Sequence, residues 1–131
     1  MGARLILLGT AGAVLPLVLA AASGPSVLSQ ITPGLWEISG SRGAPATRLC
    51  VAQPPLLAQV EHRSAKCSRT ILRNDSASAV IEYSCPGAGF GHSKIRVITP
   101  RSVRVETQGI ADYAPFAYTV DARRVGNCPG H

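Results

Sequence analysis

Residues 67–85 read CSRTILRNDSASAVIEYSC, and this stretch decides the fold because it predicts one β-hairpin flanked by two cysteines. The polar run at 74–78 separates two strand-like segments and supplies the turn. If the hairpin is symmetric about Ser76, Cys67 stands directly opposite Cys85. Opposed residues in a non-hydrogen-bonded pair bring their Cβ atoms to about 4.5–5.5 Å, close to disulfide reach. We therefore predict a Cys67–Cys85 disulfide.

The other two of the four cysteines, Cys50 and Cys128, then pair with each other. The spacing argues against zinc, whose structural sites usually bring cysteine ligands in close pairs such as C-x-x-C. An even number of cysteines in a short exported chain is instead typical of a disulfide framework. One alternative stays open, in which Cys50 pairs with Cys67 across a short helix and Cys85 pairs with Cys128.

The first 22 residues have the three parts of a cleavable secretory signal peptide, a basic start, an apolar middle at 5–22 and small residues at its end. We predict cleavage after Ala22. Residues 23–30 are then expected to be a flexible leader, and residues 31–131 a single domain. The alternative is that the apolar run stays as a membrane anchor, since about 18 apolar residues approach the thickness of a bilayer.

A second hairpin follows the first along the chain. Pairing residues 94–98 with residues 102–106 about a turn at 99–101 places Ile95 opposite Val105. One face of this hairpin is then apolar and the other charged, which is typical of an antiparallel sheet with one solvated face. In the first hairpin Ile71 is expected opposite Ile81, and Arg69 opposite Tyr83, on one face.

Further segments complete the expected architecture. The Pro-initiated stretch at 54–63 predicts the one short helix, with Leu57 and Val60 on its apolar stripe and Gln59 facing out. The other expected elements are paired strands at 33–39 and 47–51, loops at 86–91 and 108–115, and a last strand at 116–123. The fold class is mostly β: an antiparallel meander of about seven strands, forming a curled sheet or half-barrel, stabilised by disulfides.

Four segments of the chain carry a resemblance to a known family. They are Pro33–Glu37, Arg48–Val51, Tyr83–Cys85 and Arg123–Cys128. Together they resemble the bacterial exported domain-of-unknown-function family 3617 over essentially the whole mature chain. The resemblance implies a periplasmic bacterial protein, and it transfers no catalytic residue because that family has no established activity. The chain departs from the family pattern at Asn127, where Asp is more usual, and in lacking a Trp before the glycine-rich loop.

Candidate chemistry is sparse. The glycine-rich segment 87–91 lacks the following helix that phosphate binding requires, so we expect a flexible loop. His62, His92 and His131 have no carboxylate or cysteine at metal-ligand spacing, and we expect each on the surface. The sequence therefore gives no catalytic, cofactor-binding or metal-ligating residue, and no cofactor is expected.

Charge is the one physical indication of a partner. The chain has 13 Lys and Arg against 7 Asp and Glu, a net charge of +6. A basic stripe of this kind attracts anionic lipid headgroups, glycans or acidic proteins of the cell envelope, whereas export and few aromatics argue against nucleic acid. The residues expected to form this anionic-surface site are Arg63, Lys66, Arg69, Arg96 and Arg104.

Three functions follow as hypotheses. The first is a periplasmic, non-catalytic module that binds or supports another envelope component through its basic face, and that is not an integral membrane protein after cleavage. The second is a carrier of small apolar ligands in a cavity under the curled sheet. Its expected lining residues are Trp36, Ile95, Val97 and Tyr118. The third is an enzyme whose site is not recognisable from the sequence.

Overall fold

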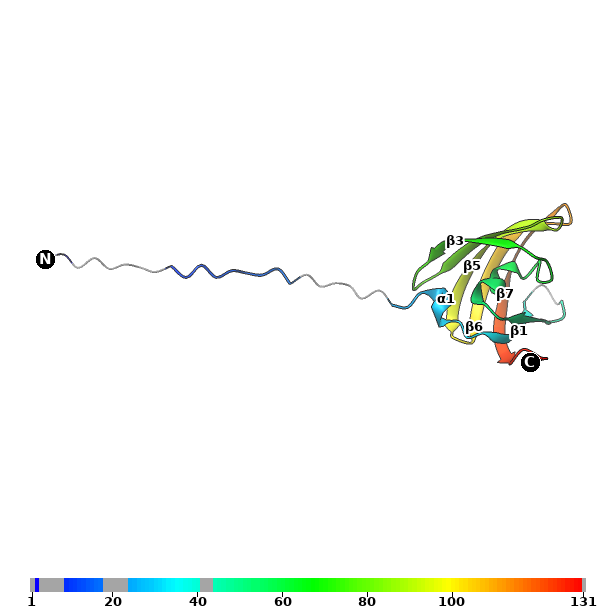
Figure 1. Ribbon diagram of the computed structural model, residues 1–131, viewed down its shortest axis with the longest axis horizontal. Helices are drawn as coiled ribbons and strands as arrows, with labels where there is room; N and C mark the ends of the chain where they lie inside the picture. The colour runs from blue at the N-terminus through cyan, green and yellow to red at the C-terminus, as the bar shows by residue number, and fades with distance from the viewer. Residues whose placement is uncertain (1, 3–8, 18–23, 41–43, 131) are drawn as a thin grey trace.

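Seven antiparallel strands form one curled sheet with the strand order β2-β1-β7-β6-β5-β4-β3 (Figure 1). The computed structural model describes residues 2, 9–17, 24–40 and 44–130. Within these residues the elements are α1 (Val27–Gln30), β1 (Gly34–Ser39), β2 (Thr47–Val51), the 3-10 helix η1 (Pro54–Gln59), β3 (Ser68–Asn74), β4 (Ala79–Cys85), β5 (Gly89–Thr99), β6 (Ser102–Ala111) and β7 (Ala114–Gly126). The mostly β fold class is thus confirmed.

The predicted first hairpin is confirmed as β3 and β4. Ile71 pairs with Ile81. A bulge after Ile71 shifts the pairing by one residue, so that Arg73 pairs with Val80 nearer the turn. The Cys67–Cys85 disulfide has formed, with Cα atoms 4.1 Å apart. Cys50 is bonded to Cys128, so the alternative connectivity is excluded.

The second hairpin is confirmed as β5 and β6, with Ile95 opposite Val105. Both strands are longer than expected. The predicted loop at 86–91 is wrong because β5 already begins at Gly89, and the loop at 108–115 shrinks to a two-residue turn between β6 and β7. The loops were expected because glycine usually indicates a loop, yet Gly91 and Gly109 pair with each other inside the sheet. The side chains of Tyr83 and Phe116 occupy the space that a Cβ atom at these positions would need.

The inner face of the curled sheet holds the core. Alternate residues of β1, β4, β5 and β6 are buried on this face, together with Val51 of the edge strand β2 and Val120 and Ala122 of β7, and the two helices pack over them (Figure 1). Leu57 and Ala58 of η1 are fully buried against the sheet. The helix predicted at 54–63 is a 3-10 helix that ends at Gln59, and turns follow it. This difference changes which side chains point inward.

The expected flexible leader at 23–30 is wrong for the residues from Val27 onward. Val27 and Leu28 are buried in α1. The Val27 N–H donates to the Asp75 carbonyl at 2.7 Å, and the Leu28 N–H donates to the Asn74 side chain at 3.1 Å. The ordered domain therefore begins before residue 31, because the apolar residues Val27, Leu28 and Ile31 complete its core.

Residues 9–17 belong to neither a helix nor a strand, and they extend away from the domain (Figure 1). No helix in the described part of the chain is long and apolar enough to span a membrane. Residues 1, 3–8 and 18–23 lie outside the described residues, and the predicted cleavage point is among them. The signal peptide therefore stays a prediction.

Candidate functional site

The outer face of the sheet, turned away from η1 and α1, carries the candidate site. Cross-strand pairing aligns two neighbouring rows of side chains over five strands. The first row is Thr70, Glu82, His92, Gln108 and Ala117. The second row is Ser68, Ser84, Phe90, Ile110 and Pro115. One row is thus mainly polar, while the other has an apolar centre.

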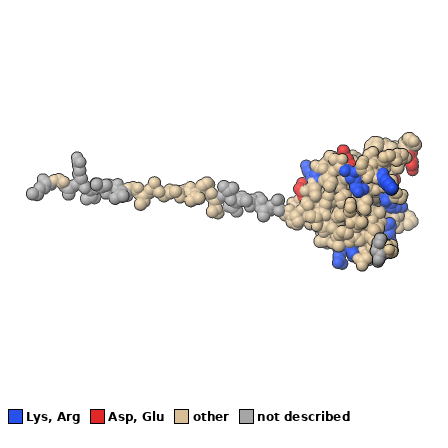
Figure 2. Space-filling model, viewed as in Figure 1, with Lys and Arg blue, Asp and Glu red and all other residues tan. Residues whose placement is uncertain are grey.

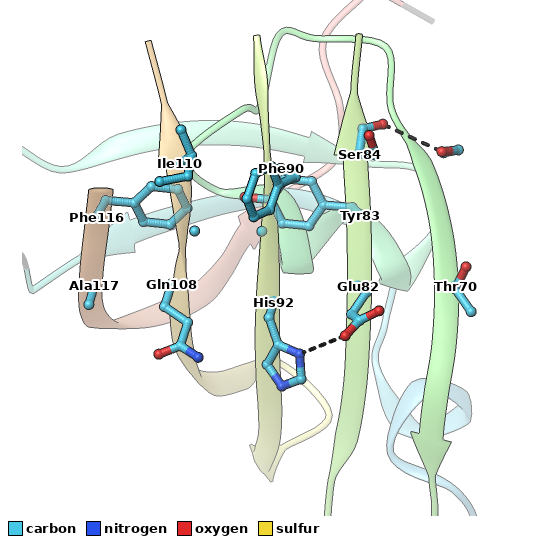
Figure 3. Close-up of a pocket in the computed structure, with 13 residues that line it drawn as sticks. Thr70, Glu82, Tyr83, Ser84, Phe90, His92, Gln108, Ile110, Phe116 and Ala117 are labelled. Atoms are coloured by element: carbon cyan, nitrogen blue, oxygen red, sulfur yellow. Dashed lines mark hydrogen bonds and ion pairs between the residues drawn. The ribbon is translucent and has the colours of Figure 1, made fainter. Parts of the chain in front are cut away.

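A hollow of about 800 Å³ lies over these two rows, and we call it the outer groove. Figure 3 shows the rows as two levels, with Phe90 and Ile110 on one level and Glu82, His92 and Gln108 on the other. Phe90, the second residue of β5, is 54% exposed. The residues that line the outer groove are Ser68, Thr70, Glu82, Tyr83, Ser84, Phe90, Gly91, His92, Gln108, Gly109, Ile110, Phe116 and Ala117.

Two glycines lie opposite each other on β5 and β6 at this groove. Gly91 pairs with Gly109, and a Cβ atom on Gly91 would lie only 2.4 Å from the Tyr83 ring. A Cβ atom on Gly109 would meet the Phe90 carbonyl oxygen at 2.1 Å and the Phe116 ring at 3.0 Å. Side chains are therefore excluded at both positions, and the aromatic rings of Tyr83 and Phe116 pack directly against the glycine backbone.

The polar row offers both donors and acceptors. His92 Nδ1 lies 3.4 Å from Glu82 Oε1, and both side chains are partly exposed. The Gln108 side chain stands beside His92. A smaller hollow of about 340 Å³ continues past His92, Gln108 and Ala117 to Lys94 and Glu106. The outer face therefore offers hydrogen-bonding groups of both kinds beside an apolar ledge.

An unusual turn connects β6 to β7 beyond the outer groove. Asp112 and Tyr113 both have positive φ, at 48° and 63°, and Tyr113 is fully exposed. Two-residue hairpin turns of this kind favour Asn-Gly or Asp-Gly, because a side chain in the left-handed region costs free energy. A tyrosine is therefore held at this tip at the expense of stability. Residues kept in such conformations cluster at binding sites.

The five predicted anion-binding residues do not converge. Arg104 bonds Asp121 at 2.9 Å and Arg96 lies 4.0 Å from Glu106, both on the outer face. The hydrogen bond to Asp121 raises the pKa of Arg104. Arg69 instead donates to Gln59 beside η1, at 2.6 Å, and Arg63 and Lys66 are exposed between η1 and β3. Figure 2 shows Lys and Arg as separate groups on the visible face, with uncharged surface between them.

The residues expected to line a carrier cavity pack the core instead. Trp36 and Ile95 are fully buried among the side chains of the inner face, and Val97 and Tyr118 pack against the same cluster. The Tyr118 hydroxyl donates to Glu61, and burial followed by this hydrogen bond raises the pKa of Tyr118 well above its usual range. These four residues therefore stabilise the fold.

His62 is buried, so the expectation of a surface histidine is wrong at this position. The bonds from the His62 N–H to the Gln59 carbonyl and from the Ala65 N–H to the His62 carbonyl are both of the 3-10 type. Residues three apart share one face in such geometry, which turns Gln59 and His62 inward together. His92 lies on the outer face as expected, and His131 lies outside the described residues.

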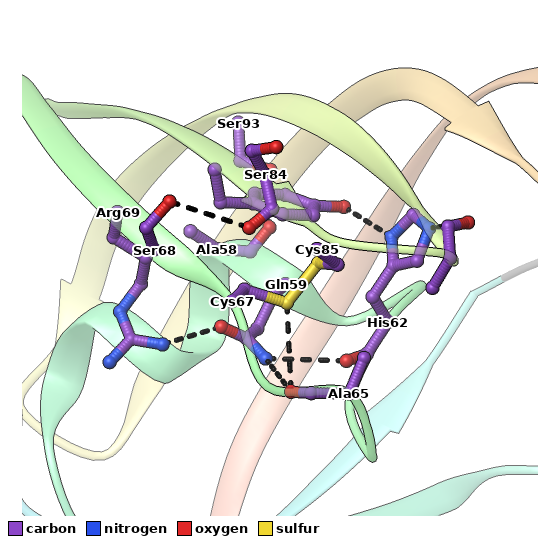
Figure 4. The surroundings of a disulfide bond; sticks show 12 residues. Ala58, Gln59, His62, Ala65, Cys67, Ser68, Arg69, Ser84, Cys85 and Ser93 are labelled. Atoms are coloured by element: carbon purple, nitrogen blue, oxygen red, sulfur yellow. Dashed lines mark hydrogen bonds between the residues drawn. A yellow bond between two sulfur atoms is a disulfide. The ribbon is translucent and has the colours of Figure 1, made fainter.

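The buried His62 belongs to a polar network near the Cys67–Cys85 disulfide (Figure 4). His62 Nε2 lies 3.1 Å from the Ala88 carbonyl, which can only accept, so Nε2 donates and Nδ1 is left to accept from the Tyr83 hydroxyl in the tautomer that this geometry selects. Burial raises the pKa of Tyr83 to about 12. The Gln59 amide donates to the carbonyls of His62 and Ala65, both at 3.2 Å. This network fixes the segment between η1 and β3 onto the sheet.

No family model, curated protein or solved structure matched this chain. The resemblance to family 3617 therefore stays a prediction, and function must be argued from the geometry of the site. Sequence reasoning missed the outer groove. A signal was present in the alternation that places Phe90 and Ile110 on the polar face of their hairpin, opposite each other, but the expected loops at 86–91 and 108–115 concealed it.

Proposed function

We propose that this protein is an exported, periplasmic, non-catalytic domain that binds another component of the cell envelope through its outer groove. The observation that carries this proposal is the hollow of about 800 Å³ around the half-exposed Phe90. Hollows lined by adjacent apolar side chains such as Phe90 and Ile110, with a few polar groups beside them, are typical of binding sites. The inner face is packed by η1 and α1, which makes the outer face the accessible side of the sheet.

Export is supported by the cysteines. All four are paired in two disulfides, and such bonds persist in oxidising compartments such as the periplasm. The apolar N-terminal segment with its small-residue end would supply the export signal. The basic face proposed from the sequence is replaced by the outer groove as the binding site, because Arg96 and Arg104 already have acidic partners.

The test uses the full chain produced in a Gram-negative bacterium. Cell fractionation, mass spectrometry and thiol labelling should find the protein in the periplasm, cleaved near Ala22 and without reactive thiols. Purified protein is then incubated with washed cell-envelope fragments and sedimented. Wild-type protein should sediment with the fragments. The Phe90→Ala variant should sediment with them about tenfold less, as expected when an exposed aromatic contact is removed.

Ile98→Ala is the matched control, because Ile98 is on the same strand, is 62% exposed and does not line the groove. Its retention should equal that of wild type. Cytosolic protein with free thiols would overturn the assignment to the periplasm. Equal retention of the Phe90 and Ile98 variants would overturn the outer groove as the binding site.

A further inference from the structure

We infer that the ligand of the outer groove is a neutral oligosaccharide, lying across strands β3 to β7 with one sugar ring against Phe90. This inference rests on the proposed function and names the class of its ligand. Sugar rings combine an apolar face of C–H groups with a rim of hydroxyl groups. A matching site must therefore set an aromatic or aliphatic surface beside a line of side chains that both donate and accept.

The apolar half of such a site is the pair Phe90 and Ile110. They are directly opposite on β5 and β6, so their side chains form one ledge on the outer face. Phe90 is 54% exposed, which leaves the ring available for contact with a ligand. The Gly91–Gly109 pair sits immediately beside this ledge, and the rings of Tyr83 and Phe116 pack against it from the inner face.

The polar half is the neighbouring row. Glu82 accepts hydrogen bonds, Gln108 both donates and accepts, and His92 in its neutral form has one nitrogen of each kind. A sugar hydroxyl also donates one bond and accepts others, so this row can satisfy hydroxyls in either role. The row lies one step along the strands from Phe90, so a ring held on the aromatic ledge directs its rim toward these three side chains.

The charges that line the groove favour a neutral ligand over the anionic partners expected from the net charge of +6. The hollow of about 800 Å³ has no Lys or Arg among its lining residues, and its one carboxylate, Glu82, repels anions. Where the outer face continues to Lys94, Glu106 is part of the same smaller hollow. A phosphate or sulfate group would find no Lys or Arg within the outer groove and would face Glu82, whereas an uncharged polyhydroxylated ligand carries no such penalty.

The shape of the groove suits a chain rather than a single sugar. The polar row runs over five strands, from Thr70 to Ala117. Neighbouring strands are about 4.8 Å apart, so this row extends over roughly 19 Å. A linear oligosaccharide of a few rings is of comparable length. Ala117 keeps the far end of the row open because its side chain is small.

The experiment is a titration of ¹⁵N-labelled, disulfide-bonded protein, followed by amide chemical shifts. The probes are the tetramer of β-1,4-linked N-acetylglucosamine, maltotetraose, and vesicles containing anionic phosphatidylglycerol. At least one tetrasaccharide should shift the amides of Phe90, His92, Gln108 and Ile110 at concentrations up to about 10 mM, the weak-binding range for a small neutral ligand. The vesicles should not shift these amides.

Phe90→Ala and, separately, Gln108→Ala should each weaken the affinity for that tetrasaccharide about tenfold, while Ile98→Ala leaves it unchanged. Both substituted positions are on the exposed face, and a dispersed amide spectrum confirms that each variant is folded. The inference is overturned if neither tetrasaccharide shifts the groove amides, or if only the vesicles do. Loss of envelope retention in Phe90→Ala without any saccharide response would refute the ligand class and leave the proposed function standing.

Discussion

The His62 imidazole and the Tyr83 hydroxyl are 3.0 Å apart, although 21 positions separate these residues in the chain. This contact joins the turns after η1 to the buried face of β4. Ser93 and Thr107 lie beside it, with their hydroxyl groups 2.8 Å apart. The hydrogen bond between His62 and Tyr83 fixes the segment after η1 in one arrangement on the sheet, because any other arrangement leaves buried polar groups without partners.

Replacing Tyr83 by Phe should lower the free energy of unfolding at pH 7 by about 1–2 kcal/mol, because His62 Nδ1 loses its donor. Urea denaturation measures this loss. Tyr113→Phe is the control, since the Tyr113 side chain is fully exposed, and it should leave the stability unchanged.

The same tyrosine predicts a loss of stability in alkaline solution. Burial raises the pKa of Tyr83 in the folded state to about 12, above the ordinary value of 10.0. Its contribution is therefore fully present below pH 10 and is lost as the pH rises toward 12, by roughly 2 kcal/mol. In Tyr83→Phe the decline in unfolding free energy over this window should be smaller. An unchanged decline would show that Tyr83 ionises freely in the folded protein.

The two disulfides should differ in their contribution to stability. Replacing Cys50 and Cys128 together by Ala should reduce the free energy of unfolding by about 4 kcal/mol, because the closed loop is long. The corresponding double change at Cys67 and Cys85 should cost about 3 kcal/mol, since its loop is short. The sequence separations are 78 and 18 residues. Denaturant titrations of the two double variants provide the measurement, and a reversed order would contradict the loop-length argument.

Tyr113→Gly should stabilise the protein by about 1 kcal/mol, because glycine relieves the left-handed conformation at the β6–β7 turn. Thermal unfolding should show a melting temperature higher by roughly 4 °C. Tyr113→Ala is the matched control, since alanine removes the ring but keeps the Cβ atom and its steric penalty. If alanine stabilises as much as glycine, the exposed ring and not the backbone is the source of the cost.

Val27→Ala should lower the free energy of unfolding by about 2 kcal/mol, since it removes buried methyl groups from the contact between α1 and the sheet. Val27 is fully buried in the core. Val125→Ala makes the same chemical change at a site that is 39% exposed and should cost far less. Equal costs at the two positions, measured in urea, would mean that α1 contributes little to the folded domain.

The sheet was predictable because its hairpins are close to symmetric about polar turns. In residues 67–85 the cysteines and the paired isoleucines indicate one register, which the structure keeps from the disulfide to Ile71 and Ile81, and a bulge after Ile71 shifts it by one residue toward the turn. The apolar and charged faces of β5 and β6 follow from strict alternation, which a shift of one residue would invert. These signals are local in the sequence, so no knowledge of the tertiary structure was needed.

The site was not predictable by the same reasoning. Gly91 and Gly109 are typical loop residues, and only the tertiary pairing of β5 with β6 and the rings packed against them show that they belong to a sheet. The inward turn of His62 depends on hydrogen bonds of the 3-10 type that continue from Gln59 into the turns after η1, which hydrophobic periodicity does not reveal. The basic site stays a prediction, and net charge gave no information on which arginines have acidic partners, as Arg96 and Arg104 do.

Each disulfide holds one border of the sheet. Cys50 belongs to β2, the first strand in the sheet order, and Cys67 directly precedes β3, the last. Border strands have unpaired backbone groups that can recruit strands from neighbouring molecules. Reduction would release both borders at once, so folding under reducing conditions should yield intermolecular β-aggregates, and the two disulfides act as a safeguard against them.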